Sequence, residues 1–320
     1  MAWQTKIKTA LEGVKEREEL KKYTTIGVGG VADYFYVAKT IEELVGAVAI
    51  ARNIGAPYRV IGLGSNILVS DSGYPGLVIL NKTSSLSIDP RSGRVIADSG
   101  VPLSRVILEA GGQGLGGLES LYGIPGTVGG AIIGNAGAHG ISTGEFLRSS
   151  SVLISSEKIV NCKNKWFEFG YRTSRLKYKA TNSPPVILNA IFQFQRRNKD
   201  GILQDIARYK KWREEHQPLG LKTCASVFKN PVATDDAKTE LEKEKTAGYL
   251  LENSGAKKLS QGDAKVSKIH ANWIINSGKA TSFDVRTLIE KMRRAVSQKF
   301  HVDLEEEVEY LGVWNGTQEK

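Results

Sequence analysis

Apolar residues recur at helical spacing in several parts of the chain. The clearest stripe runs from Ile41 to Val48, follows the capping-box sequence at residues 40–43, and ends before Gly55. A threonine followed by glutamate three positions later is typical of a helix start, and glycine commonly ends a helix, so we predict a helix over residues 40–55. Similar stripes or start signals predict helices over residues 102–110, 196–215, 246–254 and 284–300.

Short apolar runs, separated by turn residues, predict strands between these helices. They cover residues 58–61, 67–69, 77–80, 94–97, 151–155 and 186–194, and the alternation over residues 302–310 predicts a closing strand. We expect a turn at residues 73–76 and a long glycine-rich loop over residues 111–140. The mixture of elements indicates an α+β protein.

The pattern changes character twice along the chain. Residues 1–85 alternate helix and strand, residues 86–200 contain mainly short strands, and residues 201–308 combine amphipathic helices with a closing strand. We therefore predict three domains with these boundaries, and residues 309–320 form a tail that could return to the first domain. A length of 320 residues suggests about two domains, and one or three domains also agree with it.

Composition places the chain among ordinary globular proteins. Hydrophobic residues make up 41% and charged residues 24%, which excludes the disordered, collagen-like and coiled-coil classes. The first residues lack the apolar stretch of a signal peptide, and no window of about 18 residues is apolar enough to span a bilayer. Cys162 and Cys224 lie outside any CxxC or zinc-binding pattern. We expect a soluble, cytoplasmic protein.

The chain is basic, with 44 lysines and arginines against 34 acidic residues and a net charge of +10. A basic excess favours anionic partners. One alternative is a nucleic-acid-binding protein, because the helix predicted over residues 284–300 carries Arg286, Lys291, Arg293, Arg294 and Lys299. No nucleic-acid-binding motif accompanies these residues, and a solvated helix face is the simpler interpretation.

Two glycine-rich segments are candidates for ligand binding. The sequence Gly-Leu-Gly-Ser-Asn at residues 62–66 lies between two predicted strands, where it could form an anion-binding nest or only a tight turn. Residues 123–134 contain five glycines, whose entropy cost of roughly 0.5–1 kcal/mol each requires a compensating interaction. A cofactor loop and a structural loop both remain open, although no P-loop or dinucleotide-binding GxGxxG pattern occurs.

Three further motifs combine residues that could act in catalysis. Arg172 follows Tyr171 and is either a surface residue or a cation placed against a developing negative charge. The segment at residues 226–231 combines a hydroxyl, a cation and an amide before a proline, as a capped turn also does. Glu307 lies in an acidic run that could simply be a solvated strand edge. The four histidines lack metal-binding spacing.

In their order along the chain, these motifs resemble one enzyme family. The chain resembles the UDP-N-acetylenolpyruvoylglucosamine reductases, the flavoproteins of peptidoglycan precursor synthesis, over nearly its whole length. The segments that carry the resemblance are residues 24–30, 62–69, 117–119, 123–131, 135–137, 170–174, 226–231, 247–252, 266–267, 270–272 and 304–308. Each segment is ambiguous alone, but the ordered set is highly specific.

The resemblance implies the fold, the cofactors and the reaction. The fold is an FAD-binding domain of the vanillyl-alcohol-oxidase/PCMH type in two subdomains, followed by a C-terminal α+β substrate-binding domain. FAD is bound non-covalently and NADPH is the co-substrate. Hydride passes from NADPH to the flavin and then to the enolpyruvyl double bond of UDP-N-acetylglucosamine enolpyruvate, which gives the D-lactyl ether UDP-N-acetylmuramate.

The same resemblance implies roles for individual residues. Hydride addition produces an enolate-like intermediate that Arg172 stabilises, Ser226 protonates and Glu307 assists through a hydrogen bond. The implied substrate contacts are Tyr171, Lys229 and Asn230. The implied FAD contacts are Gly62, Gly64, Ser65, Asn66, Gly123, Ile124, Pro125, Gly126, Thr127, Gly130, Asn135, Ala136 and Gly137.

The chain departs from the family pattern in places. The spacing between Arg172 and Ser226 is similar to that of the shorter form, which lacks a substrate-covering tyrosine loop, so we assign no lid tyrosine. Ile26 and Val28 stand where we expect bulkier residues, and residues 261–263 replace a frequent pair of glycines.

An FAD-dependent alcohol or sugar oxidase of the same fold is an alternative, but it would leave the Ser226 and Glu307 motifs unexplained. As partners we expect the UDP-sugar and NADPH. We expect no metal, nucleic acid, membrane insertion or obligate protein partner.

Overall fold

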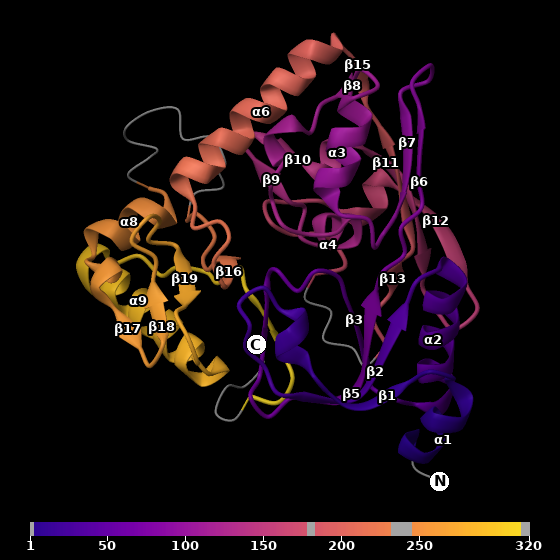
Figure 1. Ribbon diagram of the computed structural model, residues 1–320, viewed down its shortest axis with the longest axis horizontal. Helices are drawn as coiled ribbons and strands as arrows, with labels where there is room; N and C mark the ends of the chain where they lie inside the picture. Colours follow the sequence, from indigo (N-terminus) through magenta and orange to yellow (C-terminus); the bar gives the residue numbers. More distant parts are fainter. Residues whose placement is uncertain (1–2, 178–182, 232–244, 315–320) are drawn as a thin grey trace. The chain divides into compact units, whose positions relative to one another are not determined.

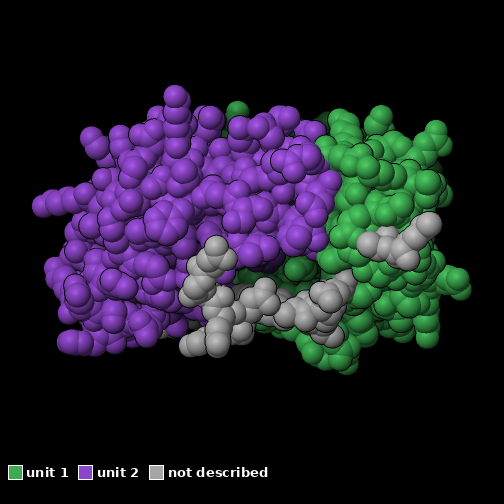
Figure 2. All heavy atoms as spheres, turned by 90° about the horizontal axis from the view of Figure 1, so that it is seen from below, with its two compact units in different colours: residues 1–16, 34–62, 76–212 green, residues 17–33, 63–75, 213–320 purple. Residues whose placement is uncertain are grey.

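The computed structural model of the chain describes residues 3–177, 183–231 and 245–314 (Figure 1). Its contacts group the chain into two compact units (Figure 2). Unit 1 contains residues 1–16, 34–62 and 76–212, and unit 2 contains residues 17–33, 63–75 and 213–320. The predicted domain boundaries after residues 85 and 200 stay predictions, because units defined by contacts need not fold independently. Within the predicted tail, residues 315–320 lie outside the described part.

The first sheet has the strand order β1-β2-β5-β3. Its strands are β1 (Lys15–Glu19), β2 (Val31–Ala38), β5 (Tyr74–Asn81) and β3 (Tyr58–Ile61), with helices α1 (Trp3–Ala10) and α2 (Ile41–Ile54). Helix α2 begins and ends as predicted, since the Thr40 side chain accepts a hydrogen bond from the Glu43 N–H and Gly55 adopts a left-handed conformation. Its buried stripe packs against Leu77 and Ile79 of β5.

The turn predicted at residues 73–76 is wrong beyond its first residue. Strand β5 already begins at Tyr74, so Tyr74 to Gly76 belong to the strand. The chain turns earlier, where the Gly73 N–H donates to the Ser70 carbonyl over 2.9 Å. Glycine and proline at positions 73–76 are typical of turns, but the turn closes at Gly73 and leaves Pro75 in the strand.

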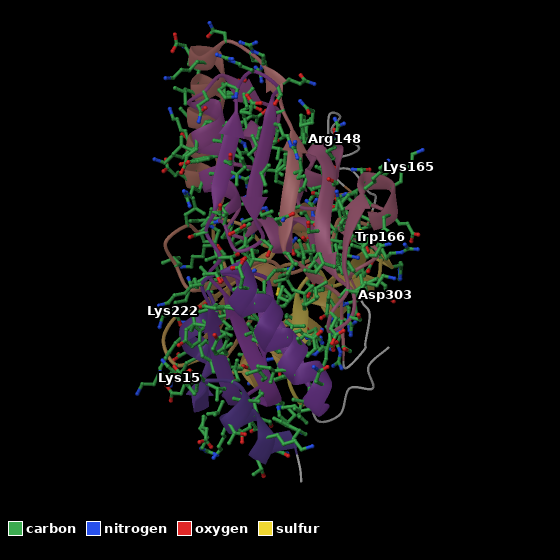
Figure 3. The ribbon with its side chains drawn as sticks, turned by 90° about the vertical axis from the view of Figure 1, so that its right-hand side faces the viewer. Lys15, Arg148, Lys165, Trp166, Lys222 and Asp303 are labelled. Atoms are coloured by element: carbon green, nitrogen blue, oxygen red, sulfur yellow. The ribbon has the colours of Figure 1, made fainter. Side chains whose placement is uncertain are left out.

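The second sheet of unit 1 has the order β12-β11-β14-β7-β6, and β13 also pairs with β11. The strands are β6 (Leu86–Asp89), β7 (Arg94–Asp98), β11 (Leu147–Leu153), β12 (Ile159–Lys163), β13 (Val186–Ile187) and β14 (Asn189–Gln193). Val95 and Phe192 face a core that also contains residues of helices α3 (Leu103–Gly111) and α4 (Val128–Ile133) (Figure 1). Exposed basic side chains such as Arg148 and Lys165 lie near the β11–β12 end of the sheet (Figure 3).

The glycine-rich segment over residues 111–140 is not one long loop. It contains β8 (Leu115–Gly116), a 3-10 turn (Glu119–Leu121), helix α4 (Val128–Ile133) and β9 (Gly137–Ala138). Thr127 caps α4, because its hydroxyl accepts a hydrogen bond from the Gly130 N–H. Val128 and Ile132 are fully buried, and this burial offsets the entropy cost of the glycines. Strands β8 and β9 pair with β15 (Gln195–Arg196) and β10 (Ile141–Ser142), and α5 spans Thr143–Phe146.

Unit 2 is built on a four-stranded antiparallel sheet with the order β16-β19-β18-β17. The strands are β16 (Thr223–Ser226), β17 (Ser260–Gln261), β18 (Ala264–Val266) and β19 (Trp273–Asn276). Helix α6 (Lys199–His216) leads into this unit, and α8 (Ala247–Asn253) and α9 (Ser282–Phe300) belong to it. The predicted stripe of α9, from Val285 to Val296, is fully buried in the core. Ile26 and Val28 are buried in the same core, so the departure from bulkier residues leaves them packed.

The closing strand predicted over residues 302–310 is mostly wrong. Only β20 (Glu309–Leu311) is a strand, and it pairs in parallel with β4 (Ile67–Val69). Residues 302–308 form one isolated bridge, between Glu306 and Phe228. The alternation of Leu304 and Val308 reflects burial without a continuous ladder.

Helix α9 is anchored to the β4 segment. Both carboxylate oxygens of Asp71 accept hydrogen bonds from the first helical N–H groups, those of Ser282 and Phe283, at 2.9 Å each. The Ser282 hydroxyl donates to the Val69 carbonyl. An anionic cap at a helix N-terminus satisfies groups that the helix itself leaves without partners.

We predict that Asp71→Ala lowers the free energy of unfolding by about 1–2 kcal/mol, because two helix N–H groups lose their acceptor. Urea denaturation followed by circular dichroism measures this change. The control is Asp303→Ala, at an exposed position (Figure 3), which should change stability by less than about 0.5 kcal/mol. Equal effects of the two substitutions would contradict the anchoring role.

Candidate functional site

Motifs that are far apart in the sequence meet through hydrogen bonds in unit 2. Thr25 donates its N–H to the Gly64 carbonyl over 3.1 Å and its hydroxyl to the Thr223 carbonyl over 2.6 Å. The Asn66 side-chain amide donates to the Glu307 carbonyl over 3.0 Å. The segments at residues 24–30, 63–66, 223–230 and 304–308 therefore form one cluster.

The loop at residues 63–66 has the properties of an anion-binding nest. Gly64 is buried with φ 61°, and a Cβ there would lie 2.0 Å from the Tyr23 carbonyl oxygen. Within the part of the chain that the structure describes, the N–H groups of Leu63, Gly64 and Asn66 donate no hydrogen bond. The buried Oδ1 of Asn66 likewise lacks a donor among those residues. Consecutive N–H groups without partners fit an anionic ligand.

Ser226 follows a distortion in strand β16. Thr223 pairs with Ile275 and Ser226 pairs with Trp273, so two residues of β16 stand opposite one residue of β19. Ala225, within this bulge, has the left-handed φ of 60°. The Ser226 hydroxyl makes no hydrogen bond within the described residues. This hydroxyl is therefore available to a ligand.

The neighbouring acidic run is held by backbone and ionic contacts. The Glu307 N–H donates to the Val227 carbonyl over 2.8 Å, which places Glu307 beside the segment that carries Ser226. Glu305 pairs with the buried ammonium of Lys229 over 2.5 Å. Glu306 forms an ion pair with Arg286 over 2.7 Å and accepts a hydrogen bond from the Tyr310 hydroxyl. Burial and the negative charge of Glu306 raise the pKa of Tyr310.

The predicted substrate contacts in this unit have partners within the protein. Lys229 is the cation that Glu305 neutralises. Asn230 accepts a hydrogen bond from the Ala247 N–H over 3.0 Å, at the start of helix α8. Both side chains therefore also stabilise the fold, and a ligand would have to bind them through their remaining hydrogen-bonding capacity.

In unit 1, the glycines bring backbone segments close together and leave space beside the backbone. A Cβ at Gly62 would lie 2.6 Å from the Thr127 hydroxyl oxygen, so the two segments touch. A Cβ at Gly130 or Gly134 would meet no atom closer than 3.6 Å. Within the described residues, the Gly126 and Thr127 N–H groups donate no hydrogen bond. The surface can accept a ligand that lies directly against the main chain.

Asn135 joins two predicted segments of this unit. Its side-chain oxygen accepts from the Gly144 N–H, and its amide donates to the Gly170 carbonyl, both over 2.9 Å. Because both ends of the side chain are used in this way, the backbone around Asn135 is the part most able to contact a cofactor. Sequence reasoning missed this structural role, for which the chain gives no local signal.

Arg172 lies in a strained two-residue turn. Gly170 and Thr173 exchange backbone hydrogen bonds of 3.1 and 3.3 Å, and Arg172 within the turn has φ 53°. Its guanidinium carbon lies 5.0 Å from the centre of the Tyr171 ring. The buried Lys177 donates its ammonium to the Arg172 carbonyl over 3.0 Å. Strain held by surrounding contacts is common where a residue has a functional role.

His270 and Asn272 lie in a segment that carries the family resemblance, but the sequence assigned neither residue a role. The Nδ1 of His270 accepts a hydrogen bond from the Asn272 N–H over 3.2 Å, which requires that nitrogen to be unprotonated. Burial, together with the nearby Lys257 charge, lowers the pKa of His270 to about 4. His270 is therefore neutral at physiological pH.

A cavity of about 570 Å³ lies away from these motifs, on the second sheet of unit 1. Its basic lining residues are Arg94, Arg148 and Lys163, all exposed. None of the predicted site residues lines it.

Two protein-family models match this chain and define its class. Residues 32–163 match the FAD binding domain, and residues 217–311 match the C-terminal domain of UDP-N-acetylenolpyruvoylglucosamine reductase. The chain is therefore an FAD-binding α+β protein with a distinct C-terminal domain, which confirms the predicted fold class. Taken with its relatives, the chain belongs to the UDP-N-acetylenolpyruvoylglucosamine reductase family.

Individual relatives cover nearly the whole chain. The reductase of a Thermotoga species is 38% identical over 95% of both chains, and that of Anoxybacillus flavithermus is 36% identical over 93% of this chain and 94% of its own. The crystal structure of the Thermus caldophilus reductase superposes with a TM-score of 0.75 at 34% identity, over 92% of this chain and 98% of the other.

The residues present fit FAD. In unit 2, the N–H groups of Leu63, Gly64 and Asn66 suit the diphosphate of a dinucleotide. In unit 1, the surface at Gly130 and Gly134 suits a large ligand lying against the main chain. Cys224 is fully buried, with a pKa that burial raises to about 12, and Cys162 is also buried, so neither thiol is suited to covalent attachment. Non-covalent binding agrees with these positions.

We predict that Gly64→Ala abolishes FAD retention, because the added methyl group would lie 2.0 Å from the Tyr23 carbonyl in a left-handed conformation. Visible absorbance of the purified protein measures bound flavin. Gly46→Ala is the matched control, since a Cβ at this position in α2 meets no atom within 4 Å, and it should retain flavin fully. Retention by both variants would argue against the nest.

We predict that His270 makes stability depend on pH. An unfolded histidine has a pKa of about 6.5, against about 4 in the fold, so the unfolded state binds the proton more readily. Stability is complete above about pH 6.5 and falls as the pH decreases towards 4, by about 2 kcal/mol at about pH 5. Urea denaturation at both pH values should show this loss in the wild type and a smaller one in His270→Gln. The same loss in both proteins would contradict it.

Proposed function

We propose that this chain reduces the enolpyruvyl group of UDP-N-acetylglucosamine enolpyruvate to a D-lactyl ether and so forms UDP-N-acetylmuramate. FAD is the non-covalent cofactor and NADPH the hydride donor. The observation that carries the proposal is the hydrogen-bonded cluster in unit 2. It brings together the loop at residues 63–66, the segment that contains Ser226, and Glu307, in a chain of this family. An FAD-dependent oxidase would need neither Ser226 nor Glu307.

Ser226 is the proposed proton donor. FAD, when bound, would supply the chemistry of hydride transfer from NADPH to the enolpyruvyl double bond. The substrate carbon that becomes electron-rich then needs a proton, and a carbanion-like carbon is basic enough to take one from a hydroxyl. The Ser226 hydroxyl is suited to this step because no described residue engages it.

Arg172 and Glu307 stabilise the charge that precedes protonation. Arg172 is a permanent cation for the substrate carboxylate, and its strained turn is fixed by Lys177. Glu307 polarises the intermediate through a hydrogen bond, and its backbone is tied to Val227, next to Ser226. Both roles act on charge that develops only during the reaction.

The remaining predicted residues bind the two ligands. Tyr171, Lys229 and Asn230 contact the UDP-sugar, with Lys229 keeping its pair to Glu305. The FAD contacts comprise residues 62, 64–66, 123–127, 130 and 135–137, through the N–H groups and open glycine surfaces described above.

We place the enzyme in peptidoglycan precursor synthesis in the cytoplasm, where NADPH and nucleotide sugars are available. None of the described helices combines the length and apolar character needed to cross a bilayer. The positive charges of α9 that suggested nucleic acid are largely engaged within the fold. Arg286 and Arg293 pair with Glu290, Lys291 binds Gln261, and Lys299 binds the Asn253 carbonyl.

We predict that Ser226→Ala separates the two half-reactions. Reduction of bound FAD by NADPH should stay within about twofold of wild type, because no proton is delivered to the sugar in that step. Flavin reoxidation by the enolpyruvyl substrate should slow by roughly 10²–10⁴-fold, the usual range for loss of a general acid. Anaerobic stopped-flow absorbance measures both rates. Reoxidation at the wild-type rate would reject Ser226 as the donor.

A further inference from the structure

Strand β16 reaches Ser226 through a bulge that changes which way the serine faces. Residues paired across an antiparallel ladder point to the same side of the sheet. Thr223 pairs with Ile275 and Ser226 pairs with Trp273. Because these two partners are two positions apart, Thr223 and Ser226 lie on the same side of the sheet, although they are three positions apart in β16. Without the extra residue, Ser226 would share the side of Cys224, which is fully buried. The bulge therefore keeps the hydroxyl out of the core.

The bulge must be held in place by contacts on its far side. Ala225 has φ 60°, an uncommon conformation for a residue with a side chain. Strand β19 begins at Trp273, so no strand residue stands opposite the chain beyond Ser226. The backbone groups of Val227 and Phe228 are nevertheless buried and need partners.

Asn272 supplies these partners. Its carbonyl accepts from the Val227 N–H over 2.9 Å. Its side-chain oxygen accepts from the Phe228 N–H over 2.9 Å, and its side-chain amide donates to the Phe228 carbonyl over 2.8 Å. One asparagine thus presents a donor and an acceptor side by side, as a further strand residue would. These hydrogen bonds continue the pairing past Ser226, where β19 itself has ended.

The same two residues connect to the acidic run. The Val227 carbonyl accepts the Glu307 N–H over 2.8 Å, and Phe228 forms the bridge to Glu306. Residues 226–228 are therefore fixed between Asn272 on one side and residues 306–307 on the other. A change at Asn272 would move Ser226 and Glu307 together.

We propose that Asn272 is a positioning residue for proton transfer, whose side-chain amide keeps the bulge at Ala225 and with it the direction of the Ser226 hydroxyl. This inference rests on the function proposed above. Asn272 touches neither substrate nor cofactor in this proposal, and it acts through the backbone of Phe228. A misplacement of about 1 Å at a reacting group can slow a step by up to about 10²-fold.

The test compares Asn272→Asp with the same substitution at Asn276, a buried asparagine at the far end of β19. Asn272 is 4% exposed and Asn276 is 5% exposed. The Asn276 amide donates to the Ile26 carbonyl, and its oxygen accepts the Gly278 and Ala280 N–H groups. Replacement of either asparagine by aspartate removes one buried amide donor and adds a charge, so the two variants carry similar structural penalties. Asn272→Ala, which removes the side-chain bonds without adding charge, is a second variant.

In the holoenzyme, we expect Asn272→Asp and Asn272→Ala to slow flavin reoxidation by the enolpyruvyl substrate roughly 10- to 100-fold. NADPH reduction of the flavin should stay within about twofold of wild type. The solvent deuterium isotope effect on reoxidation should rise, because a displaced hydroxyl makes proton transfer rate-limiting. Asn276→Asp should leave both rates and the isotope effect unchanged.

Two results would overturn the inference. One is an equal effect of Asn272→Asp and Asn276→Asp on reoxidation, and the other is an equal slowing of both half-reactions without a change in the isotope effect. Failure of the proposed function is distinguishable, because wild-type flavin reduced by NADPH would then not be reoxidised by the enolpyruvyl substrate.

Discussion

Buried backbone groups must all find hydrogen-bond partners, and unit 2 depends on how Val227 and Phe228 find theirs. These residues lie beyond the end of a regular ladder, between Asn272 and the acidic run that contains Glu307. The partners come from segments separated in sequence by tens of residues. Because each contact is short-range and directional, the loss of any one would leave a buried donor or acceptor without compensation. The irregular geometry around Ser226 is therefore well determined.

Both units place a non-glycine residue in the left-handed conformation at or beside a proposed catalytic group. Ala225 precedes Ser226, and Arg172 itself has φ 53°. Such residues are strained, and in each unit a buried polar side chain holds the distortion, Asn272 in one and Lys177 in the other. In both units the unusual conformation lies in the backbone at or next to a proposed catalytic side chain, where regular secondary structure would not place it.

Ion pairs within the fold neutralise several of the basic side chains, including those on α9. Arg286 and Arg293 of α9 are engaged by Glu290 and Glu306, while Lys229 is paired with Glu305. His270 is kept neutral by burial. These interactions make much of the acidic run and of the basic helix part of the fold. In unit 2, the N–H groups that donate no hydrogen bond among the described residues, those of Leu63, Gly64 and Asn66, fit an anionic ligand.

The sequence by itself determined the long helices, the short apolar strands, the α+β class and the family, because helix caps, periodic stripes and an ordered set of motifs are local signals. Helix α2, with its Thr40 cap and Gly55 end, shows how far such signals reach. Only the tertiary structure decided the helix within residues 123–134, the near-absence of a closing strand, and the roles of Asn135, Lys177 and Asn272. These features depend on hydrogen bonds between segments distant in the chain, such as Asn272 with Phe228, and local spacing carries no information about such pairs.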